Sequence, residues 1–285
     1  MKFGVFIFAT DTSIRPDRLA REVEARGFES LWFPEHSHIP ISRETPWGGQ
    51  KDAPPLPEHY WRTHDQFVAL AYAASATTNL RLGTGIALVA QRDAIWTAKE
   101  VASLDNLSGG RVIFGVGYGW NREEMAQHGI PYAQRRQVMR EKVMMMRALW
   151  TEEEARFDGE HVSLEPSWAW PKPTQKPYPP IVMGAAAGPK TLKDIVDYCD
   201  GWIPLATRHE IAGQIAKVRA AVAEAGRDAE QFEVTAYSTK IDRVEELEEA
   251  GVDRAVFSLP PLGPEVVIPK LDEWSNALDL KGTSA

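Results

Sequence analysis

Short apolar runs rich in β-forming residues alternate with helical patterns along this sequence, and that alternation restricts its fold more than any other feature. Each run is too short for a helix and long enough for a buried strand. The eight runs fall at residues 3–8, 30–33, 81–89, 112–116, 181–183, 201–205, 232–237 and 254–259. Strands that alternate with helices form a parallel sheet, and eight such units predict an α/β fold, the closed (β/α)8 TIM barrel. A doubly wound open sheet is the alternative.

The helical patterns carry boundary signals of their own. Pro16 suits the first turn of a helix, and Gly27 ends that helix just before the second strand. Gly251 likewise is expected to end a later helix, just before the last strand. No low-complexity linker divides the chain, so we expect residues 1–285 to form a single TIM-barrel domain.

Two long stretches interrupt the alternation. Residues 35–64, after the second strand, are rich in proline. Residues 155–180, after the fourth strand, contain a plausible hairpin turn at Asp158-Gly159 and then a proline-rich run. Loops that follow barrel strands lie at the C-terminal end of the barrel, where the chemistry of such enzymes takes place. We therefore expect both insertions to act as lids over one mouth of the barrel.

Composition and charge narrow the classes of function. The 285 residues are 44% hydrophobic and 25% charged, as in ordinary globular proteins, and the net charge of −8 disfavours a nucleic-acid partner. The single cysteine, Cys199, excludes a disulfide framework and a multi-thiolate metal site. No apolar run approaches the roughly 20 residues that cross a bilayer, so we expect no membrane partner and a soluble, cytoplasmic protein.

His36 directly follows the second strand, at the end of the barrel where chemistry is expected. Histidine titrates near neutrality and can act as a general acid or base, although a loop histidine bonded only to its neighbours is the alternative. His38 completes a His-x-His pair typical of metal sites on barrel strands. The eighth strand, however, ends in Ser258-Leu259-Pro260-Pro261 without a carboxylate. We therefore predict no metal, which disfavours a metal hydrolase.

A loop of small residues follows the fifth strand and leads into a helix at Pro189. It consists of Gly184, Ala185, Ala186, Ala187 and Gly188. Such a loop at a helix N-terminus presents free N–H groups and a positive dipole end, which favours a phosphate. A tight turn that needs small residues for packing is the alternative.

Glycines and large rings mark other segments at the same end. Gly115, Gly117 and Gly119 are a weak match to a dinucleotide fingerprint, and they provide either room for a flat ring or packing space. Three tryptophans belong to loops on the predicted active face and are expected to line a substrate pocket: Trp47, Trp61 and Trp120.

Several motifs in the middle of the chain belong together. They are Thr84-Gly85-Ile86, the segment from Ala98 to Leu107-Ser108-Gly109-Gly110-Arg111, Gly115-Val116-Gly117-x-Gly119-Trp120 with Glu123-Glu124, and Asp200-Gly201-Trp202. In these motifs the chain resembles the luciferase-like monooxygenase (LLM) superfamily, over about residues 3–260. It resembles most the F420-dependent oxidoreductase branch, which uses the deazaflavin coenzyme F420, whereas a sister branch uses FMN.

This resemblance implies a barrel that holds the ring of F420, or alternatively of FMN, at its C-terminal mouth. It implies a non-prolyl cis peptide at Gly85-Ile86 and places His36 beside the ring as the catalytic residue. The cofactor-binding residues that it implies, besides His36, are Phe6, Glu35, Gly85, Ile86, Gly117 and Tyr118, with Gly184, Ala185, Ala186, Ala187 and Gly188 at the phosphate.

Two positions depart from the family's pattern. Trp120 stands where sugar-phosphate dehydrogenases of the superfamily have a glutamate, so we do not carry that activity over and expect a bulkier, more apolar substrate. Gly85 stands where relatives often have a residue with a side chain, which leaves the ring contacts there open.

The leading hypothesis is an F420-dependent oxidoreductase that transfers a hydride between the coenzyme and a small, largely apolar organic substrate. His36 would give or take the proton, while the coenzyme supplies the hydride chemistry. An FMN-dependent monooxygenase that uses O2 is the first alternative, and a non-catalytic flavin-binding protein is the second. Because relatives commonly pair through barrel helices, the resemblance also implies a homodimer.

Overall fold

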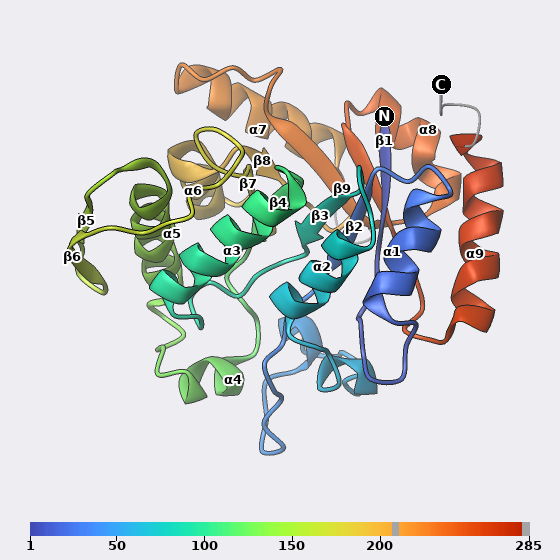
Figure 1. Ribbon diagram of the computed structural model, residues 1–285, viewed down its shortest axis with the longest axis horizontal. Helices are drawn as coiled ribbons and strands as arrows, with labels where there is room; N and C mark the ends of the chain where they lie inside the picture. The colour runs from blue at the N-terminus through green and yellow to red at the C-terminus, as the bar shows by residue number, and fades with distance from the viewer. Residues whose placement is uncertain (207–210, 281–285) are drawn as a thin grey trace.

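Eight parallel strands close into a barrel at the centre of the computed structural model, which describes residues 1–206 and 211–280 (Figure 1). Around the barrel the strands follow the order β1-β10-β9-β8-β7-β4-β3-β2. Their bounds are β1 Lys2–Phe6, β2 Ser30–Phe33, β3 Arg81–Thr84, β4 Val112–Val116, β7 Ile181–Met183, β8 Gly201–Trp202, β9 Glu233–Thr239 and β10 Arg254–Ser258. The predicted barrel is confirmed, and the open sheet is wrong.

The third strand is shorter than the apolar run predicts. β3 ends at Thr84, and the Gly85–Ile86 peptide that follows is cis, as the resemblance implied. Beyond it, Ala87 forms an isolated parallel bridge with Val116. The chain therefore leaves the sheet after Thr84 and places the backbone of Gly85 and Ile86 at the mouth of the barrel.

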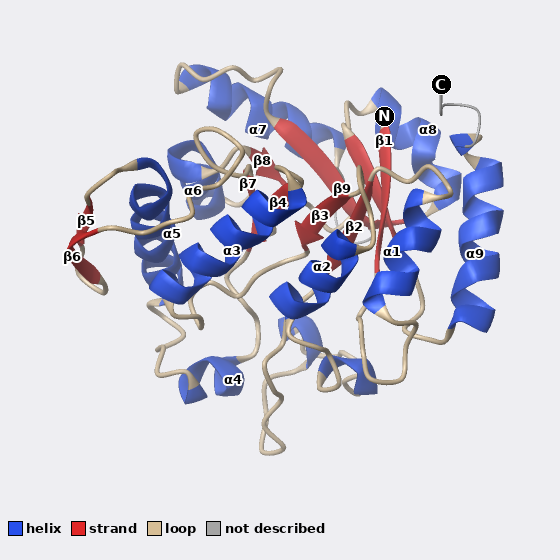
Figure 2. Cartoon of the chain, in the orientation of Figure 1, coloured by secondary structure: helices blue, strands red, loops and turns tan. Residues whose placement is uncertain are grey.

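Helices surround the barrel on its outside (Figure 2). Their bounds are α1 Pro16–Glu24, α2 Gln66–Ser75, α3 Ala94–Ser108, α4 Arg122–Gln127, α5 Arg135–Thr151, α6 Pro189–Tyr198, α7 Ala212–Glu224, α8 Val244–Glu249 and α9 Pro264–Ala277. Short 3-10 turns are η1 Trp47–Gly49, η2 Glu58–Tyr60 and η3 Ile241–Arg243, and a hairpin is formed by β5 Ala155–Asp158 and β6 Ser163–Ser167. No helix in the described part of the chain is long and apolar enough to cross a bilayer.

The first insertion, residues 35–64, forms a loop whose two ends meet. The hydroxyl of Thr63 donates a hydrogen bond to the carbonyl of His36 at 3.0 Å. Thr63 also forms an antiparallel bridge with Thr10, which lies just beyond β1. These contacts fix both ends of the insertion beside the C-terminal ends of β1 and β2.

The short helix α4 anchors the far part of the same insertion. One carboxylate oxygen of Glu123 accepts the backbone N–H groups of Glu44 and Thr45, at 3.1 and 3.0 Å. Figure 1 shows this insertion, in blue, and α4, in green, on the same side of the barrel. α4 was not predicted from the sequence; it starts where the Asn121 side chain accepts the N–H of Glu124 at 3.3 Å.

The second insertion, residues 155–180, takes a different place. It follows the helix α5 and not a strand, so it begins at the N-terminal end of the barrel. Its hairpin packs against the side of α5, where the Glu141 carboxylate accepts the N–H of His161 at 2.7 Å. It then returns past the end of α3, where the N–H of Gln175 bonds to Asp105 at 2.9 Å. Of the two insertions expected over the mouth, only the first lies there.

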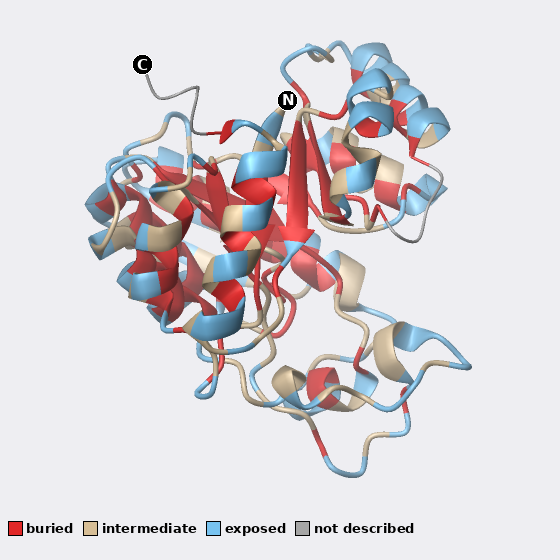
Figure 3. Cartoon of the chain, turned by 90° about the vertical axis from the view of Figure 1, so that its right-hand side faces the viewer, coloured by how far each residue is buried: buried red, intermediate tan, exposed pale blue. Residues whose placement is uncertain are grey.

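The interior of the barrel is filled with apolar side chains, which lie within the buried centre of the molecule (Figure 3). They are Phe6, Trp32, Ile113, Val182, Ile203, Tyr237 and Val256. Trp32 is fully buried, and a Cβ atom at Gly83 would lie only 2.1 Å from its ring, so the glycine admits the indole. This layer forms a solid floor beneath the mouth.

Buried ion pairs close the N-terminal end of the barrel. Arg254, at the start of β10, has a side chain that is only 1% exposed. It donates to Glu29 at 2.8 and 2.9 Å and to Glu233 at 3.1 Å. A buried guanidinium is tolerated only when carboxylates and hydrogen bonds compensate it. The two glutamates therefore seal this end and leave the mouth as the place for a ligand.

Candidate functional site

A small, mostly apolar cavity of about 140 Å³ opens at the mouth of the barrel. Its walls are formed by Gly85, Ile86, Gly184, Ala185, Ala186, Ile203, Leu205 and Tyr237. Five of these were predicted to bind a cofactor, namely Gly85, Ile86, Gly184, Ala185 and Ala186. The structure thus brings the segment after β3 and the loop after β7 together around one cavity.

Tyr237 is the aromatic side chain that lines this cavity. The predicted cofactor residue Phe6 does not line it, but the ring of Phe6 stacks on that of Tyr237 at 4.4 Å between centroids. The Tyr237 hydroxyl donates a hydrogen bond to the carbonyl of Gly85 at 3.1 Å. A Cβ atom at Gly85 would lie 2.3 Å from that hydroxyl, which explains why this position holds a glycine. Burial raises the pKa of Tyr237 well above its usual value, so the phenol stays neutral.

Three glycines near the mouth make room for neighbouring protein atoms: Gly115 in β4, Gly117 just after it, and Gly184 just after β7. A Cβ atom at Gly115 would lie 2.0 Å from the carbonyl oxygen of Thr84. A Cβ atom at Gly117 would lie 2.7 Å, and one at Gly184 2.4 Å, from side-chain atoms of Ile86. Packing therefore accounts for Gly115 and Gly117, and Ile86 occupies the space that a flat ring was expected to use there.

His36 lies beside the mouth and pairs with a buried carboxylate. Its Nδ1 lies 2.7 Å from Oε2 of Glu124, with side chains that are 6% and 0% exposed. The other oxygen of Glu124 accepts the N–H of Ser37 at 3.1 Å. Because a carboxylate can only accept, Nδ1 carries the hydrogen and Nε2 is the nitrogen available to a ligand.

Aromatic side chains of the first insertion and of the loop after β4 gather around His36. The centroid of its ring lies 5.2 Å from that of Tyr60 and 5.7 Å from that of Trp120. Trp47 contacts Tyr60 edge-on at 5.8 Å. Of the three predicted tryptophans, the structure thus brings Trp120 against His36 and Trp47 against Tyr60. Trp61 is 50% exposed and makes no ring contact with this aromatic cluster of His36, Trp47, Tyr60 and Trp120.

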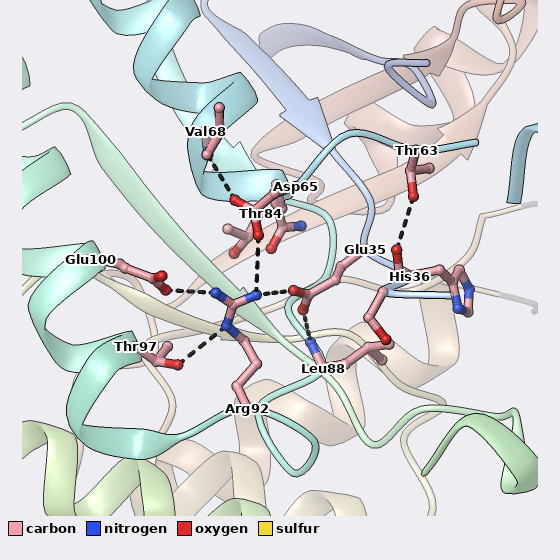
Figure 4. A network of polar contacts seen from close by, with 12 residues as sticks. Glu35, His36, Thr63, Asp65, Val68, Thr84, Leu88, Arg92, Thr97 and Glu100 are labelled. Atoms are coloured by element: carbon pink, nitrogen blue, oxygen red, sulfur yellow. Dashed lines mark hydrogen bonds and ion pairs between the residues drawn. The ribbon is translucent and has the colours of Figure 1, made fainter. Parts of the chain in front are cut away.

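Glu35 faces away from the cavity, although it precedes His36. Its carboxylate accepts the N–H of Leu88 at 2.6 Å and forms an ion pair with Arg92, which Glu100 also binds at 2.6 Å (Figure 4). Burial raises the pKa of Glu35, while Arg92 opposes that shift. In this structure Glu35 fixes the segment after β3 to the segment after β2, and it does not line the mouth cavity.

Tyr118, another predicted cofactor residue, borders the first turns of α6. Its hydroxyl donates to Asp194 at 2.5 Å, and the guanidinium of Arg136 lies 3.8 Å from the centroid of its ring. Arg136 also approaches the hydroxyl of Thr191 at 3.4 Å. Tyr118 therefore lies beside the N-terminus of α6, next to the loop of residues 184–188.

The same loop can accommodate an anion. α6 begins at Pro189, and the first N–H groups of a helix have no intrahelical partner. A Cβ atom at Gly188 would meet no other atom within 4 Å, so space is open there. Together with the flat apolar mouth, this loop fits a ligand that carries an aromatic ring system at one end and a phosphate farther along.

One grouping of possible metal ligands occurs in residues 1–206 and 211–280, and it lies away from the mouth. Glu141, Glu160 and His161 place ligand atoms within 4.8 Å of one another. The Glu141 carboxylate, however, already accepts the backbone N–H groups of His161 and Val162. The contacts of Glu141 therefore show that its carboxylate holds the hairpin to α5.

Three important residues were not anticipated as site residues. Glu124 appeared only as part of a family motif, Tyr60 only within the range of the first insertion, and Tyr237 only as the end of a strand. A buried acid that follows an asparagine N-cap is a usable signal for Glu124. Nothing in the sequence pattern links Tyr237 to Gly85, because their contact crosses the barrel.

Comparison with known proteins bears on this arrangement. A family model described as luciferase-like monooxygenase matches residues 1–242. The chain is 41% identical over 262 residues to an uncharacterized protein of Mycobacterium tuberculosis, with 91% of this chain and 92% of that protein covered.

Two further similarities are informative. The chain is 29% identical over 231 residues to the F420-dependent hydroxymycolic acid dehydrogenase of M. tuberculosis, covering 79% of this chain and 59% of that protein. A monooxygenase from Streptomyces bottropensis superposes with a TM-score of 0.78 at 18% identity, over 99% of this chain and 100% of that one. At that identity the superposition shows a shared fold.

Proposed function

Since the chain belongs to the luciferase-like monooxygenase family, we propose that it is an F420-dependent oxidoreductase acting on a small, largely apolar organic substrate. The choice of F420 is supported by the F420-dependent relative from M. tuberculosis and by the motifs of the central segment. When bound, the deazaflavin supplies or accepts the hydride. The residues of this chain hold the ring, position the substrate and move the proton.

The observation that carries the proposal is the buried pair of His36 and Glu124 at the C-terminal end of the barrel, the same end at which the mouth cavity opens. Hydride transfer to or from a carbon that bears oxygen requires a proton to move to or from that oxygen. Nε2 of His36 is free to do this, because Nδ1 is held by the carboxylate. The negative charge of Glu124 stabilises the imidazolium whenever the ring holds the proton.

The aromatic cluster suits an apolar substrate. The rings of Tyr60 and Trp120 contact that of His36, and the ring of Trp47 contacts that of Tyr60. All three belong to segments over the mouth. Large rings bury apolar surface and exclude water, which strengthens the interaction between His36 and Glu124. A substrate with a small polar centre and apolar substituents would satisfy both the histidine and the rings.

The first test is a binding titration with oxidised F420 and with FMN, side by side. We expect micromolar or tighter binding of F420 and weaker binding of FMN. Gly188→Glu should weaken F420 binding at least tenfold, because it places a carboxylate where a phosphate is expected in open space. Gly188→Gln is the matched control, since it adds the same volume without the charge, and it should bind nearly as well as the wild type.

The titration also separates the competing functions. Preference for FMN, with O2 consumed in the presence of reduced FMN, would instead support a flavin-dependent monooxygenase, which the family's description favours. Tight F420 binding without turnover of any substrate, in either direction, would support a non-catalytic flavin-binding protein. Failure to bind either coenzyme would refute all three.

A further inference from the structure

Three arginines gather beside the loop of residues 184–188, and they define what we term the arginine cluster: Arg122, Arg135 and Arg136. The guanidinium groups of Arg122 and Arg135 lie 4.6 and 3.6 Å from the centroid of the Tyr132 ring. That of Arg136 lies 3.8 Å from the centroid of the Tyr118 ring. The rings and the first turns of α4 and α5 thus hold three positive charges close together.

Acidic side chains do not compensate this charge. Among the residues that the structure describes, none forms an ion pair with Arg122 or Arg135. Arg136 has one acidic neighbour, Asp194, at 3.5 Å. Burial raises the pKa of Asp194, and its oxygen is already bonded by the Tyr118 hydroxyl. Three nearly uncompensated cations are notable in a chain with a net charge of −8.

One buried donor of the arginine cluster has no hydrogen-bond acceptor in the described part of the chain. Nε of Arg135 is buried without a hydrogen-bond partner, while its Nη1 donates to the carbonyl of Tyr132 at 2.6 Å. Burial, together with repulsion from Arg136 and Arg122, lowers the pKa of Arg135. Like charges held this close cost free energy, which a bound anion would recover.

The position of the cluster relates it to the coenzyme site. Arg136 lies 3.4 Å from the hydroxyl of Thr191, in the first turn of α6. The N-terminus of α6 follows directly on the loop of residues 184–188, where we expect the phosphate. Arg122 is exposed and lies at the start of α4, which anchors the insertion over the mouth. The cluster therefore extends from the phosphate loop toward solvent, beyond the point where a phosphate would bind.

We infer that the arginine cluster binds the carboxylates of the oligoglutamate tail of F420, which lie beyond its phosphate. This inference rests on the proposed function. FMN ends at its phosphate, whereas F420 continues through a phosphodiester into glutamate carboxylates. Guanidinium groups match carboxylates with two parallel hydrogen bonds, so the cluster would favour the longer coenzyme over FMN.

The test compares three ligands on the whole protein: F420, the tail-less deazaflavin that lacks both phosphate and glutamates, and FMN. We expect Arg122→Gln with Arg135→Gln to weaken F420 binding about tenfold or more and to leave binding of the tail-less deazaflavin and FMN within about twofold. Binding of F420, but not of the tail-less deazaflavin, should also weaken as salt rises.

Two controls accompany these variants. Arg18→Gln removes the same charge from an exposed position on α1 and should leave all three affinities unchanged. Arg135→Lys keeps the charge but loses the paired hydrogen bonds of the guanidinium, so its F420 affinity should lie between those of the wild type and Arg135→Gln. Unchanged melting temperatures would show that the variants fold like the wild type.

Several outcomes would overturn the inference. F420 binding that is tight in the wild type and unaffected in the double variant would refute the cluster while the proposed function stands. Equal weakening of all three ligands would show that the arginines only support the fold of the mouth. Equal weakening of F420 and FMN alone would assign the cluster to the phosphate. No binding of F420 to the wild type would refute the inference together with the proposed function.

Discussion

At the scale of single residues, the site depends on contacts that hold reactive groups in one orientation. The Glu124 carboxylate fixes His36 through Nδ1 and fixes the backbone of Ser37 through its other oxygen. His36 could be predicted from its place after a strand. Its partner could not, because Glu124 lies 88 residues away in sequence and meets His36 only in the folded barrel.

Glu124→Gln should lower turnover roughly 10- to 100-fold, because the amide cannot stabilise the imidazolium with a charge. We expect the pH–rate profile to change as well, since the histidine that moves the proton has lost its charged partner. Steady-state kinetics across pH measures both effects. Glu123→Gln removes the neighbouring charge without touching His36, and its profile should match the wild type; a shift of equal size there would contradict the role of Glu124.

Two glycines of the loop of residues 184–188 provide a matched pair. A Cβ atom at Gly184 would lie 2.4 Å from Ile86, whereas one at Gly188 would meet nothing within 4 Å. Gly184→Ala should therefore lower the free energy of unfolding by about 1–3 kcal/mol, and Gly188→Ala should change it by less than about 0.5 kcal/mol. Denaturant unfolding measures both, and equal effects would contradict the packing described for Ile86.

At the scale of elements, the alternation of strands and helices was sufficient to predict the barrel. Eight strands, each followed by a helix, can be connected into a closed parallel sheet in only a few ways. It did not show where each insertion lies. Residues 35–64 follow a strand and reach the mouth, whereas residues 155–180 follow α5 and pack against its side. Likewise α4 is too short and too polar to give a helical pattern, and its cap at Asn121 is the main signal.

The ion pairs of Arg254 tie β10 to β9 and to the residue before β2, so they test the closure of the barrel. Arg254→Met should lower the free energy of unfolding by about 3 kcal/mol, because it leaves Glu29 and Glu233 without their buried cation. Arg21→Met breaks an exposed pair with Asp17 and should cost less than about 1 kcal/mol. Urea unfolding of both variants distinguishes the two environments.

The same pairs predict how stability depends on pH. Burial alone would raise the pKa values of Glu29 and Glu233, but Arg254, joined at Glu233 by Lys2, brings both below their usual range. A lowered carboxyl pKa stabilises the fold above the unfolded pKa, near about 4.3, and this contribution is lost as pH falls through the folded pKa. Stability should therefore drop below about pH 4.3, and the drop should be shallower in Arg254→Met.

At the scale of the whole molecule, the homodimer stays a prediction that the structure makes testable. Apolar side chains of the neighbouring helices α2 and α3 are exposed: Val68, Tyr72, Ile95 and Trp96. Such a surface suits a second copy of the chain. We expect Tyr72→Glu to shift the species seen in sedimentation velocity from dimer to monomer. Leu107→Glu, which changes an exposed apolar residue farther along α3, is the comparison and should leave the dimer intact. A monomeric wild type would refute the prediction.

The meeting of the two ends of the first insertion has a consequence for how such a protein can change. Because Thr63 binds the carbonyl of His36, the residues between them leave and rejoin the barrel at nearly one point. Their number and sequence can vary without stretching or compressing the scaffold that carries the histidine. The segment can therefore be exchanged as a unit, and we expect such an exchange to change the surroundings of His36 while the barrel strands stay in place.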